Sequence, residues 1–76
     1  MEVSRTAPGS VALPLERALR RLRANDAALL VAQALMGLSY EELAAMQRMS
    51  VAAVRSRLYR IRRELARRYE EEGGEW

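Results

Sequence analysis

A dense series of arginines in the last third of the chain is the feature best suited to chemistry. Arg55, Arg57 and Arg60 stand close together, with Ser56 and Tyr59 among them. A guanidinium can donate two parallel hydrogen bonds to guanine or contact a phosphate, and serine and tyrosine hydroxyls can bond to base edges or phosphates. These residue types are therefore typical of a nucleic-acid surface, although a long helix can also carry arginines on a face that is only solvated.

The composition agrees with a polyanionic partner and argues against catalysis. All 13 basic residues are arginine and the formal net charge is +3, which favours a polyanion without requiring one. The chain contains neither cysteine nor histidine. Disulfides and thiolate metal sites are thereby excluded, and the commonest metal ligand and general base are missing. We expect no enzymatic activity, no metal and no cofactor.

The arginines must be positioned by helices, and the first helix is signalled soon after the amino terminus. Pro14 suits the first turn of a helix. Leucines then recur at intervals of four and three, at Leu15, Leu19 and Leu22. This spacing predicts a helix over about 14–23 with one apolar stripe.

A second helix is predicted over about 26–36. Asn25 or Asp26 can cap its start, and the segment is apolar nearly all round, as expected for a helix enclosed by its neighbours. Gly37 is expected to end it in the left-handed conformation.

Two further helix starts lie about ten residues apart. Ser39 and Glu42 form a capping box, which predicts a short helix over about 40–47. Ser50 is the next cap, and it predicts a fourth helix over about 51–69. In that helix an apolar stripe faces inward, at Val54, Leu58, Ile61 and Leu65. The other side carries Ala52, Arg55, Ser56, Tyr59, Arg60 and Arg63.

These elements predict an all-α fold, a small four-helix domain that contains a helix-turn-helix. In such a unit the first helix lies across the phosphate backbone, and the early residues of the second enter the major groove. We expect a disordered lead or linker over 1–12, the domain over 13–70 and a flexible acidic tail over 71–76. Glu64 and the glutamates at 70–72 can pair with arginines one turn away. No apolar run is long enough to cross a membrane, so a cytoplasmic protein is expected.

Two motifs carry a resemblance to a known family. Gly37-Leu38-Ser39-Tyr40-Glu41-Glu42-Leu43-Ala44 looks like "GLSYEEIA", and Val54-Arg55-Ser56-Arg57-Leu58-Tyr59-Arg60 looks like "VKSRLxR". The chain resembles region 4 of bacterial RNA polymerase sigma factors over about three quarters of its length, most closely the extracytoplasmic-function class. The resemblance implies a domain that binds the double-stranded promoter at the −35 element, docks on the flap of the RNA polymerase core and can be bound by an anti-sigma factor.

The resemblance and the physical argument together give a set of candidate DNA contacts. We expect the base-reading group to be Ala52, Arg55, Ser56, Tyr59 and Arg60. Phosphate contacts are expected from Ser39, Tyr40, Ser50, Arg57, Arg62 and Arg63, because arginines and the starts of helices attract anions. These contacts would set affinity rather than sequence choice.

Some positions depart from the family pattern. Arg48 stands where the turn of the helix-turn-helix usually has a left-handed glycine, so we expect a backbone cost of roughly 1–2 kcal/mol there. Ala52-Ala53 replaces the usual Gly-Thr pair. The sigma region that melts DNA is not recognisable, so we expect the chain alone not to be a complete initiation factor.

Two other functions remain open at this point. One is a sigma-like module that uses the apolar surface around the first two helices to bind the polymerase flap, an anti-sigma factor or itself, without reading DNA. The other is the helix-turn-helix effector domain of a response-regulator-type transcription factor. A monomer is the default, with a homodimer as the second option because the apolar second helix can leave hydrophobic surface uncovered.

Overall fold

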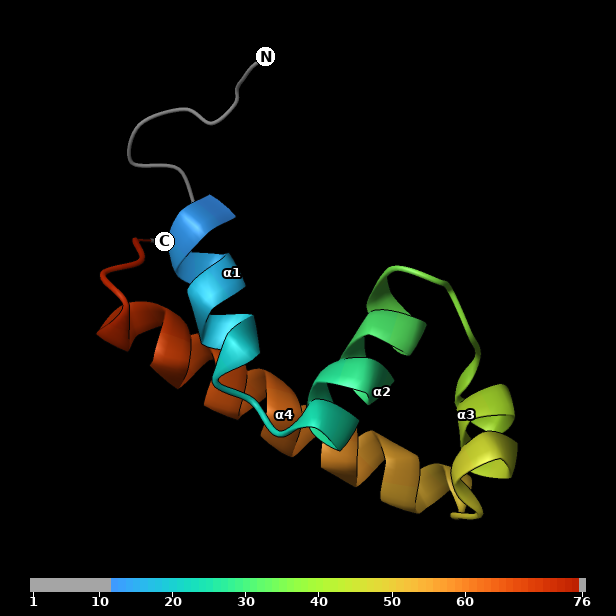
Figure 1. Ribbon diagram of the computed structural model, residues 1–76. Helices are drawn as coiled ribbons and strands as arrows, with labels where there is room; N and C mark the ends of the chain where they lie inside the picture. The colour runs from blue at the N-terminus through green and yellow to red at the C-terminus, as the bar shows by residue number, and fades with distance from the viewer. Residues whose placement is uncertain (1–11, 76) are drawn as a thin grey trace.

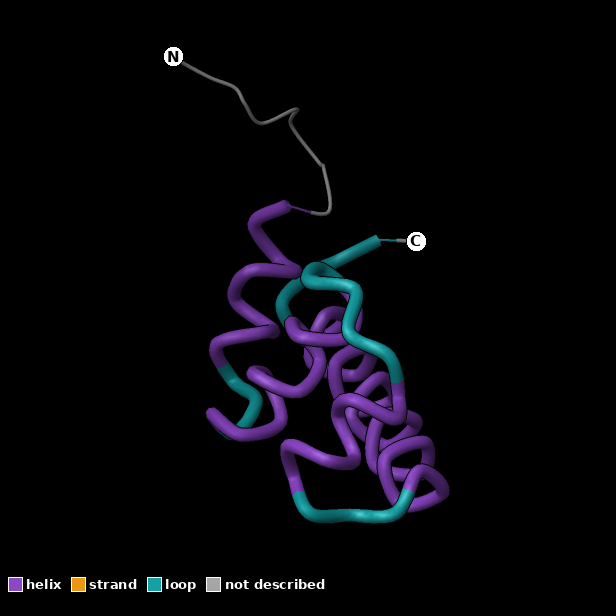
Figure 2. The backbone as a smooth tube through the Cα atoms, turned by 90° about the vertical axis from the view of Figure 1, so that its right-hand side faces the viewer, coloured by secondary structure: helices purple, strands orange, loops and turns teal. Residues whose placement is uncertain are grey.

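Four helices account for most of residues 12–75, the part of the chain that the computed structural model describes. In chain order they are α1 (Ala12–Arg20), α2 (Ala24–Ala34), α3 (Tyr40–Gln47) and α4 (Val51–Glu71), and no strand occurs in this part. The long helix α4 forms a base on which α1, α2 and α3 lie in succession, from its carboxyl end to its amino end (Figure 1). Short loops join the helices (Figure 2). The prediction of an all-α four-helix domain is confirmed.

Helix α1 begins and ends earlier than predicted. It stops at Arg20, not near residue 23, because the amides of Arg21 and Leu22 bond to carbonyls only three residues back, at 3.1 and 3.2 Å. That tighter turn releases the chain toward α2. Pro14 lies in the first turn, where a missing amide proton costs no helical hydrogen bond.

Helix α2 also begins two residues before its predicted start. Arg23 is its N-cap and makes no capping hydrogen bond with its side chain. Neither Asn25 nor Asp26 caps the helix, and the carboxylate of Asp26 instead accepts hydrogen bonds from Arg57. The Asp26 side chain, which the sequence predicted as a possible cap of α2, therefore bonds to a residue far away in the sequence.

In the link from α2 to α3, the predicted backbone conformation of Gly37 is correct, but the predicted end of α2 is too late in the chain. Helix α2 ends at Ala34, two residues before the predicted end, and its C-cap is Leu35 and not Gly37. Gly37 is left-handed as predicted, with φ of 73°. The predicted bounds of α3 are those observed.

The core lies between α4 and the three helices packed on it. Its buried members are Leu22, Leu29, Leu30, Leu43, Ala44, Val54, Leu58 and Ile61. The predicted inward stripe of α4 is confirmed at its first three positions, and Leu65 is partly buried against the same cluster. Leu22 is buried as the α1 stripe requires, while Leu19 is partly buried.

The end of α4 is packed more firmly than its composition suggested. Helix α4 continues two residues beyond the predicted end, to Glu71. Tyr69 is only 2% exposed, and its hydroxyl donates to the Glu75 carbonyl at 2.5 Å. Gly74 lies against the Tyr69 ring, where any side chain would collide with it. The division into 1–12, 13–70 and 71–76 stays a prediction, and residues 1–11 and 76 lie outside the described part.

Candidate nucleic-acid interface

Two serine caps fix where the helices of the helix-turn-helix begin. Ser39 Oγ accepts from the Glu42 amide at 3.0 Å, and the Glu42 carboxylate accepts from the Ser39 amide at 2.7 Å. Ser50 Oγ accepts from the Ala53 amide at 3.0 Å. Both predicted caps are confirmed. Each hydroxyl accepts a hydrogen bond from its helix and still has its own proton to donate to an anion.

The turn between α3 and α4 is left-handed at Arg48, as predicted. Its φ is 56° and its ψ is 46°, and among described non-glycine residues it is the one with positive φ. The following amide, of Met49, donates to the Ala44 carbonyl at 2.9 Å, which closes the end of α3. The chain therefore turns into α4 through a conformation that L-residues adopt at a cost of roughly 1–2 kcal/mol.

The predicted base-reading residues share one property in the structure: they are all exposed. They occupy the first three turns of α4, on faces away from its buried stripe, and comprise Ala52, Arg55, Ser56, Tyr59 and Arg60. Tyr59 is 60% exposed, so its ring is not part of the core. The helix thus offers guanidinium, hydroxyl and aromatic groups to the outside along one continuous stretch.

Two of these side chains are held by aromatic contacts. The Arg55 guanidinium lies over the Tyr40 ring, 5.6 Å from its centroid. The Arg63 guanidinium lies over the Tyr59 ring at 5.7 Å and donates to the Tyr59 hydroxyl at 3.2 Å. Stacking on a ring limits the freedom of a guanidinium while leaving its edge free to donate. The Tyr40–Arg55 contact also joins the start of α3 to α4.

The predicted phosphate-binding residues are less uniform. Ser39, Ser50, Arg62 and Arg63 are exposed, while Tyr40 and Arg57 are half-buried. Arg57 forms an ion pair with Asp26 at 3.1 Å, and Arg62 donates to Gln33. Both arginines therefore already have protein partners on α2, and their role toward phosphate stays a prediction.

Toward its carboxyl end α4 is neutralised by its own glutamates. Glu64 pairs with Arg67 at 2.6 Å and with Arg68 at 2.7 Å. Glu71 pairs with the same two arginines at 3.4 and 3.2 Å. The prediction that glutamates pair with arginines one turn away is confirmed for Glu64 and Glu71, whereas Glu72 pairs with Arg21, just after α1. Among the arginines of α4, those without a carboxylate partner within residues 12–75 are therefore Arg55, Arg60, Arg62 and Arg63, which all precede Glu64.

The ion pairs shift the acidity of the groups involved. The hydrogen bond from Arg67 lowers the pKa of Glu64, with a further contribution from Arg68, against partial burial that opposes it. For Glu71, partial burial raises the pKa, but the hydrogen bond from Arg68 and the charges of Arg21, Arg68 and Arg67 together lower it. The pKa of Arg67 is raised, chiefly by its hydrogen bond with Glu64. The carboxylates therefore remain charged, and keep their arginines occupied, into mildly acidic solution.

Within 12–75 no group of three or more acidic residues is placed to hold a metal ion. Of the helices described, none combines the length and hydropathy that a bilayer crossing requires.

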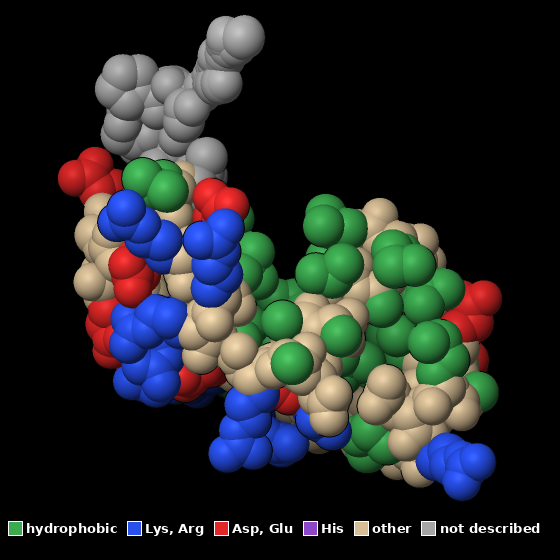
Figure 3. Space-filling model, in the orientation of Figure 1, with side chains coloured by type: hydrophobic (Ala, Val, Ile, Leu, Met, Phe, Trp, Pro, Cys, Tyr) green, Lys and Arg blue, Asp and Glu red, His purple; other side chains and the backbone are tan. Residues whose placement is uncertain are grey.

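Hydrophobic side chains gather over α2 and α3, whereas arginines follow α1 and the edge formed by α4 (Figure 3).

Comparison with known families gives this geometry a context. Residues 12–65, well over half of the chain, match the family model described as sigma-70, region 4. The chain belongs to the sigma-70 region 4 family. No curated protein and no solved structure matched it.

Sigma region 4 is a non-enzymatic helix-turn-helix domain of transcription initiation, which in sigma factors generally binds the promoter −35 element and RNA polymerase. The match runs from the start of α1 to Leu65 and so includes every predicted contact residue. It confirms the resemblance to region 4 and decides against the response-regulator-type effector domain as the family of this chain.

Some contacts of this region 4 domain were missed by sequence reasoning. The Arg57–Asp26 pair joins residues 31 positions apart, and no local pattern marks it. The stacking of Arg55 on Tyr40 was missed as well, although both residues had been singled out separately.

Proposed function

We propose that this domain reads a −35-type promoter element through the first half of α4 while docking on RNA polymerase, as a member of the extracytoplasmic-function class. The observation that carries the proposal is the joint exposure of Ala52, Arg55, Ser56, Tyr59 and Arg60 at the start of the second helix of a helix-turn-helix. That is the part of such a helix that enters the major groove. The family match supports the same reading.

Arg55 is the strongest single candidate for a base contact. It lies in the second turn of α4, is exposed, and is oriented by stacking on Tyr40. An oriented guanidinium can donate two parallel hydrogen bonds to guanine, which contribute about 1–3 kcal/mol of discrimination against a wrong base. Ser56, on the next position, adds a hydroxyl that can bond to a base edge or a phosphate.

Phosphate contacts would come from the residues around this helix. The hydroxyl protons of Ser39 and Ser50 are available at the starts of α3 and α4, where helix dipoles attract anions. Arg63 lies one turn beyond Tyr59 and keeps donors free besides the one bonded to that hydroxyl. These groups fix the position of the helix on the duplex and carry no sequence information.

The deciding experiment is selection of bound sequences from a random duplex pool, with the 76-residue chain alone and with core RNA polymerase present. We expect enrichment of a common motif, at least in the presence of polymerase. Absence of a motif under both conditions would contradict the reading function. A parallel selection with core polymerase and without this chain is the control, because it identifies motifs that do not depend on this chain.

Variants then test the assigned contact. Arg55→Ala is expected to weaken binding to the selected duplex about tenfold or more, and to random duplex much less, by fluorescence anisotropy. Arg17→Ala is the matched control, since the Arg17 side chain is exposed on α1 and forms no ion pair or hydrogen bond among the described residues. Equal losses on both duplexes would make Arg55 a phosphate contact and refute its reading role.

A second candidate function is supported by a separate surface. Leu35, Met36 and Met46 are 80%, 68% and 63% exposed. The first two follow the end of α2 and the third lies on α3. Exposed apolar groups of this size on neighbouring elements are typical of protein docking surfaces. Under this reading the domain binds a protein partner, such as the polymerase flap, through this surface and need not read DNA.

The two functions are separable by mutation. Leu35→Gln combined with Met36→Gln is expected to weaken binding to core polymerase in sedimentation or pull-down assays and to leave affinity for duplex DNA unchanged. Unchanged polymerase binding would contradict the docking role of this surface. Arg55→Ala, assayed in parallel, is expected to show the converse pattern.

A further inference from the structure

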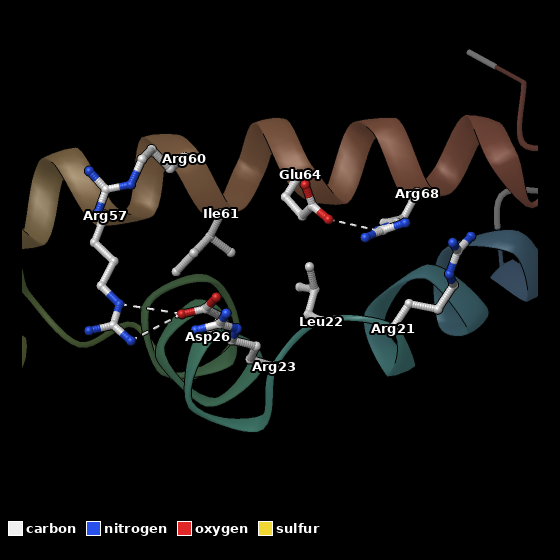
Figure 4. A pocket seen from close by; sticks show the side chains of 9 residues that line it. All are labelled: Arg21, Leu22, Arg23, Asp26, Arg57, Arg60, Ile61, Glu64 and Arg68. Atoms are coloured by element: carbon white, nitrogen blue, oxygen red, sulfur yellow. Dashed lines mark hydrogen bonds and ion pairs between the residues drawn. The ribbon is translucent and has the colours of Figure 1, made fainter.

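A cleft of about 620 Å³ lies between α4 and the connection from α1 to α2. Its floor is apolar and includes Leu22 and Ile61, both members of the core. The remaining lining is charged and comes from both walls (Figure 4). It consists of five arginines and two carboxylates. The two ends of the cleft differ in how these charges are compensated.

The end beneath α1 is electrically balanced. Arg21 pairs with Glu71 at 3.0 Å and with Glu72 at 3.1 Å. Arg68 pairs with Glu64 at 2.7 Å and with Glu71 at 3.2 Å. Both guanidiniums at this end therefore already have carboxylate partners, and little attraction for an external anion remains.

The opposite end carries an excess of positive charge. Arg57 donates from Nε and from a terminal nitrogen to one oxygen of Asp26, at 3.3 and 3.1 Å. Arg23, at the start of α2, and Arg60, one turn after Arg57, line the same end. Within residues 12–75 the side chains of Arg23 and Arg60 form no hydrogen bond or ion pair. Of the three guanidiniums at this end, only that of Arg57 is thus paired with a carboxylate.

We propose that the end of the cleft formed by Arg23, Arg57 and Arg60 binds a phosphate group. A phosphate dianion offers several acceptor oxygens, and guanidiniums match them with paired hydrogen bonds. A single carboxylate, such as Asp26 already supplies, leaves two of the three cations uncompensated. The apolar floor also strengthens attraction between opposite charges relative to bulk water. This phosphate site is distinct from the proposed base-reading group, and Arg60 is the residue that belongs to both.

Substitution of Asp26 tests the proposal, because it is expected to change phosphate affinity in the opposite direction to the loss of an arginine. Its carboxylate competes with a phosphate for Arg57 and repels any anion that enters the cleft. Asp26→Asn removes that charge with little change of shape, so it is expected to raise phosphate affinity. Arg23→Ala removes a donor whose side chain has no hydrogen bond or ion pair within residues 12–75, so it is expected to lower phosphate affinity. If these residues had a purely structural role, the two substitutions would not change phosphate affinity in opposite directions.

The experiment is calorimetric titration of the 76-residue chain with inorganic pyrophosphate at constant ionic strength, with acetate as the anion control. Arg23→Ala should bind pyrophosphate about tenfold more weakly than the unchanged chain, the loss expected for hydrogen bonds to a charged group. Asp26→Asn should bind severalfold more tightly, and Arg17→Ala should match the unchanged chain. Circular dichroism melts verify that each variant is folded. Equal binding by Arg23→Ala and Arg17→Ala, no gain in Asp26→Asn, or no binding by the unchanged chain overturns the proposal.

The source of the phosphate is distinguished by repeating the titrations with random duplex DNA. If Arg23→Ala weakens binding of both pyrophosphate and duplex, the cleft receives a backbone phosphate. If it weakens pyrophosphate alone, the ligand is a free phosphorylated small molecule. The pyrophosphate arm contains no DNA, so its failure and a failure of promoter reading are seen separately.

Discussion

Arg48→Gly is expected to stabilise the domain, although it removes a side chain. Arg48 holds φ of 56° and ψ of 46° at the turn between α3 and α4. In this left-handed region the Cβ of an L-residue crowds the following carbonyl oxygen, at a cost of roughly 1–2 kcal/mol. Glycine has no Cβ and adopts the conformation freely. The exposed side chain forms no ion pair or hydrogen bond within residues 12–75 that would be lost.

The magnitude follows from two opposing terms. Relief of the left-handed strain contributes roughly 1–2 kcal/mol. Glycine also gains conformational entropy in the unfolded chain, which lowers stability by about 0.4–1 kcal/mol. The net expectation is an increase in the free energy of unfolding of about 0.5–1 kcal/mol. For a domain of this size that corresponds to a rise in Tm of about 2–8 °C.

The assay is thermal and urea denaturation followed by far-ultraviolet circular dichroism. Arg48→Ala is the matched control, because alanine removes the same side chain and keeps the Cβ. We expect Arg48→Ala to lie within about 0.5 kcal/mol of the unchanged chain, as exposed substitutions usually do. The reasoning is refuted if Arg48→Gly is no more stable than Arg48→Ala.

Other substitutions test the caps, the core and the ion pairs. Ser50→Ala should lower the free energy of unfolding by about 1 kcal/mol through loss of the α4 cap, with Ser56→Ala as an exposed control in the same denaturation assay. Leu58→Ala, at a position that is 0% exposed, should cost about 2–5 kcal/mol and leave the chain largely unfolded by circular dichroism. Because the pKa of Glu64 is lowered in the folded chain, its stabilisation is full above the ordinary value of 4.5 and is lost as pH falls through the folded value. Glu64→Gln should therefore flatten the acid side of a plot of Tm against pH, and an unchanged slope would contradict the pairing.

Interactions within one helical turn were predictable from the sequence. The Ser39–Glu42 capping box and the Ser50 cap each join residues three apart, a distance that the geometry of a helix start fixes. The same holds for Glu64, whose arginine partners lie three and four residues away. The left-handed turn at Arg48 was also predictable, because a helix-turn-helix requires that conformation at that position.

Contacts between helices were not predictable in the same way. Asp26 was a reasonable cap by residue type, yet it meets Arg57 on a different helix, 31 residues away. Tyr69 was predicted only as the approximate end of the last helix, but it is buried, with its ring against Gly74 and its hydroxyl bonded to Glu75. The contact of Asp26 with Arg57 has no local signal, because it depends on where α2 crosses α4.

The sequence by itself determined the four helices, the inward stripe of α4 and the outward arginines, since periodicity and capping act over a few residues. Tertiary structure decided which arginines keep free guanidiniums. Packing of α2 on α4 brings Asp26 to Arg57, while Arg23 and Arg60 stay without partners beside them. The physical reason is that charge compensation depends on distance in space, and distances between helices are set by the packing of their apolar faces.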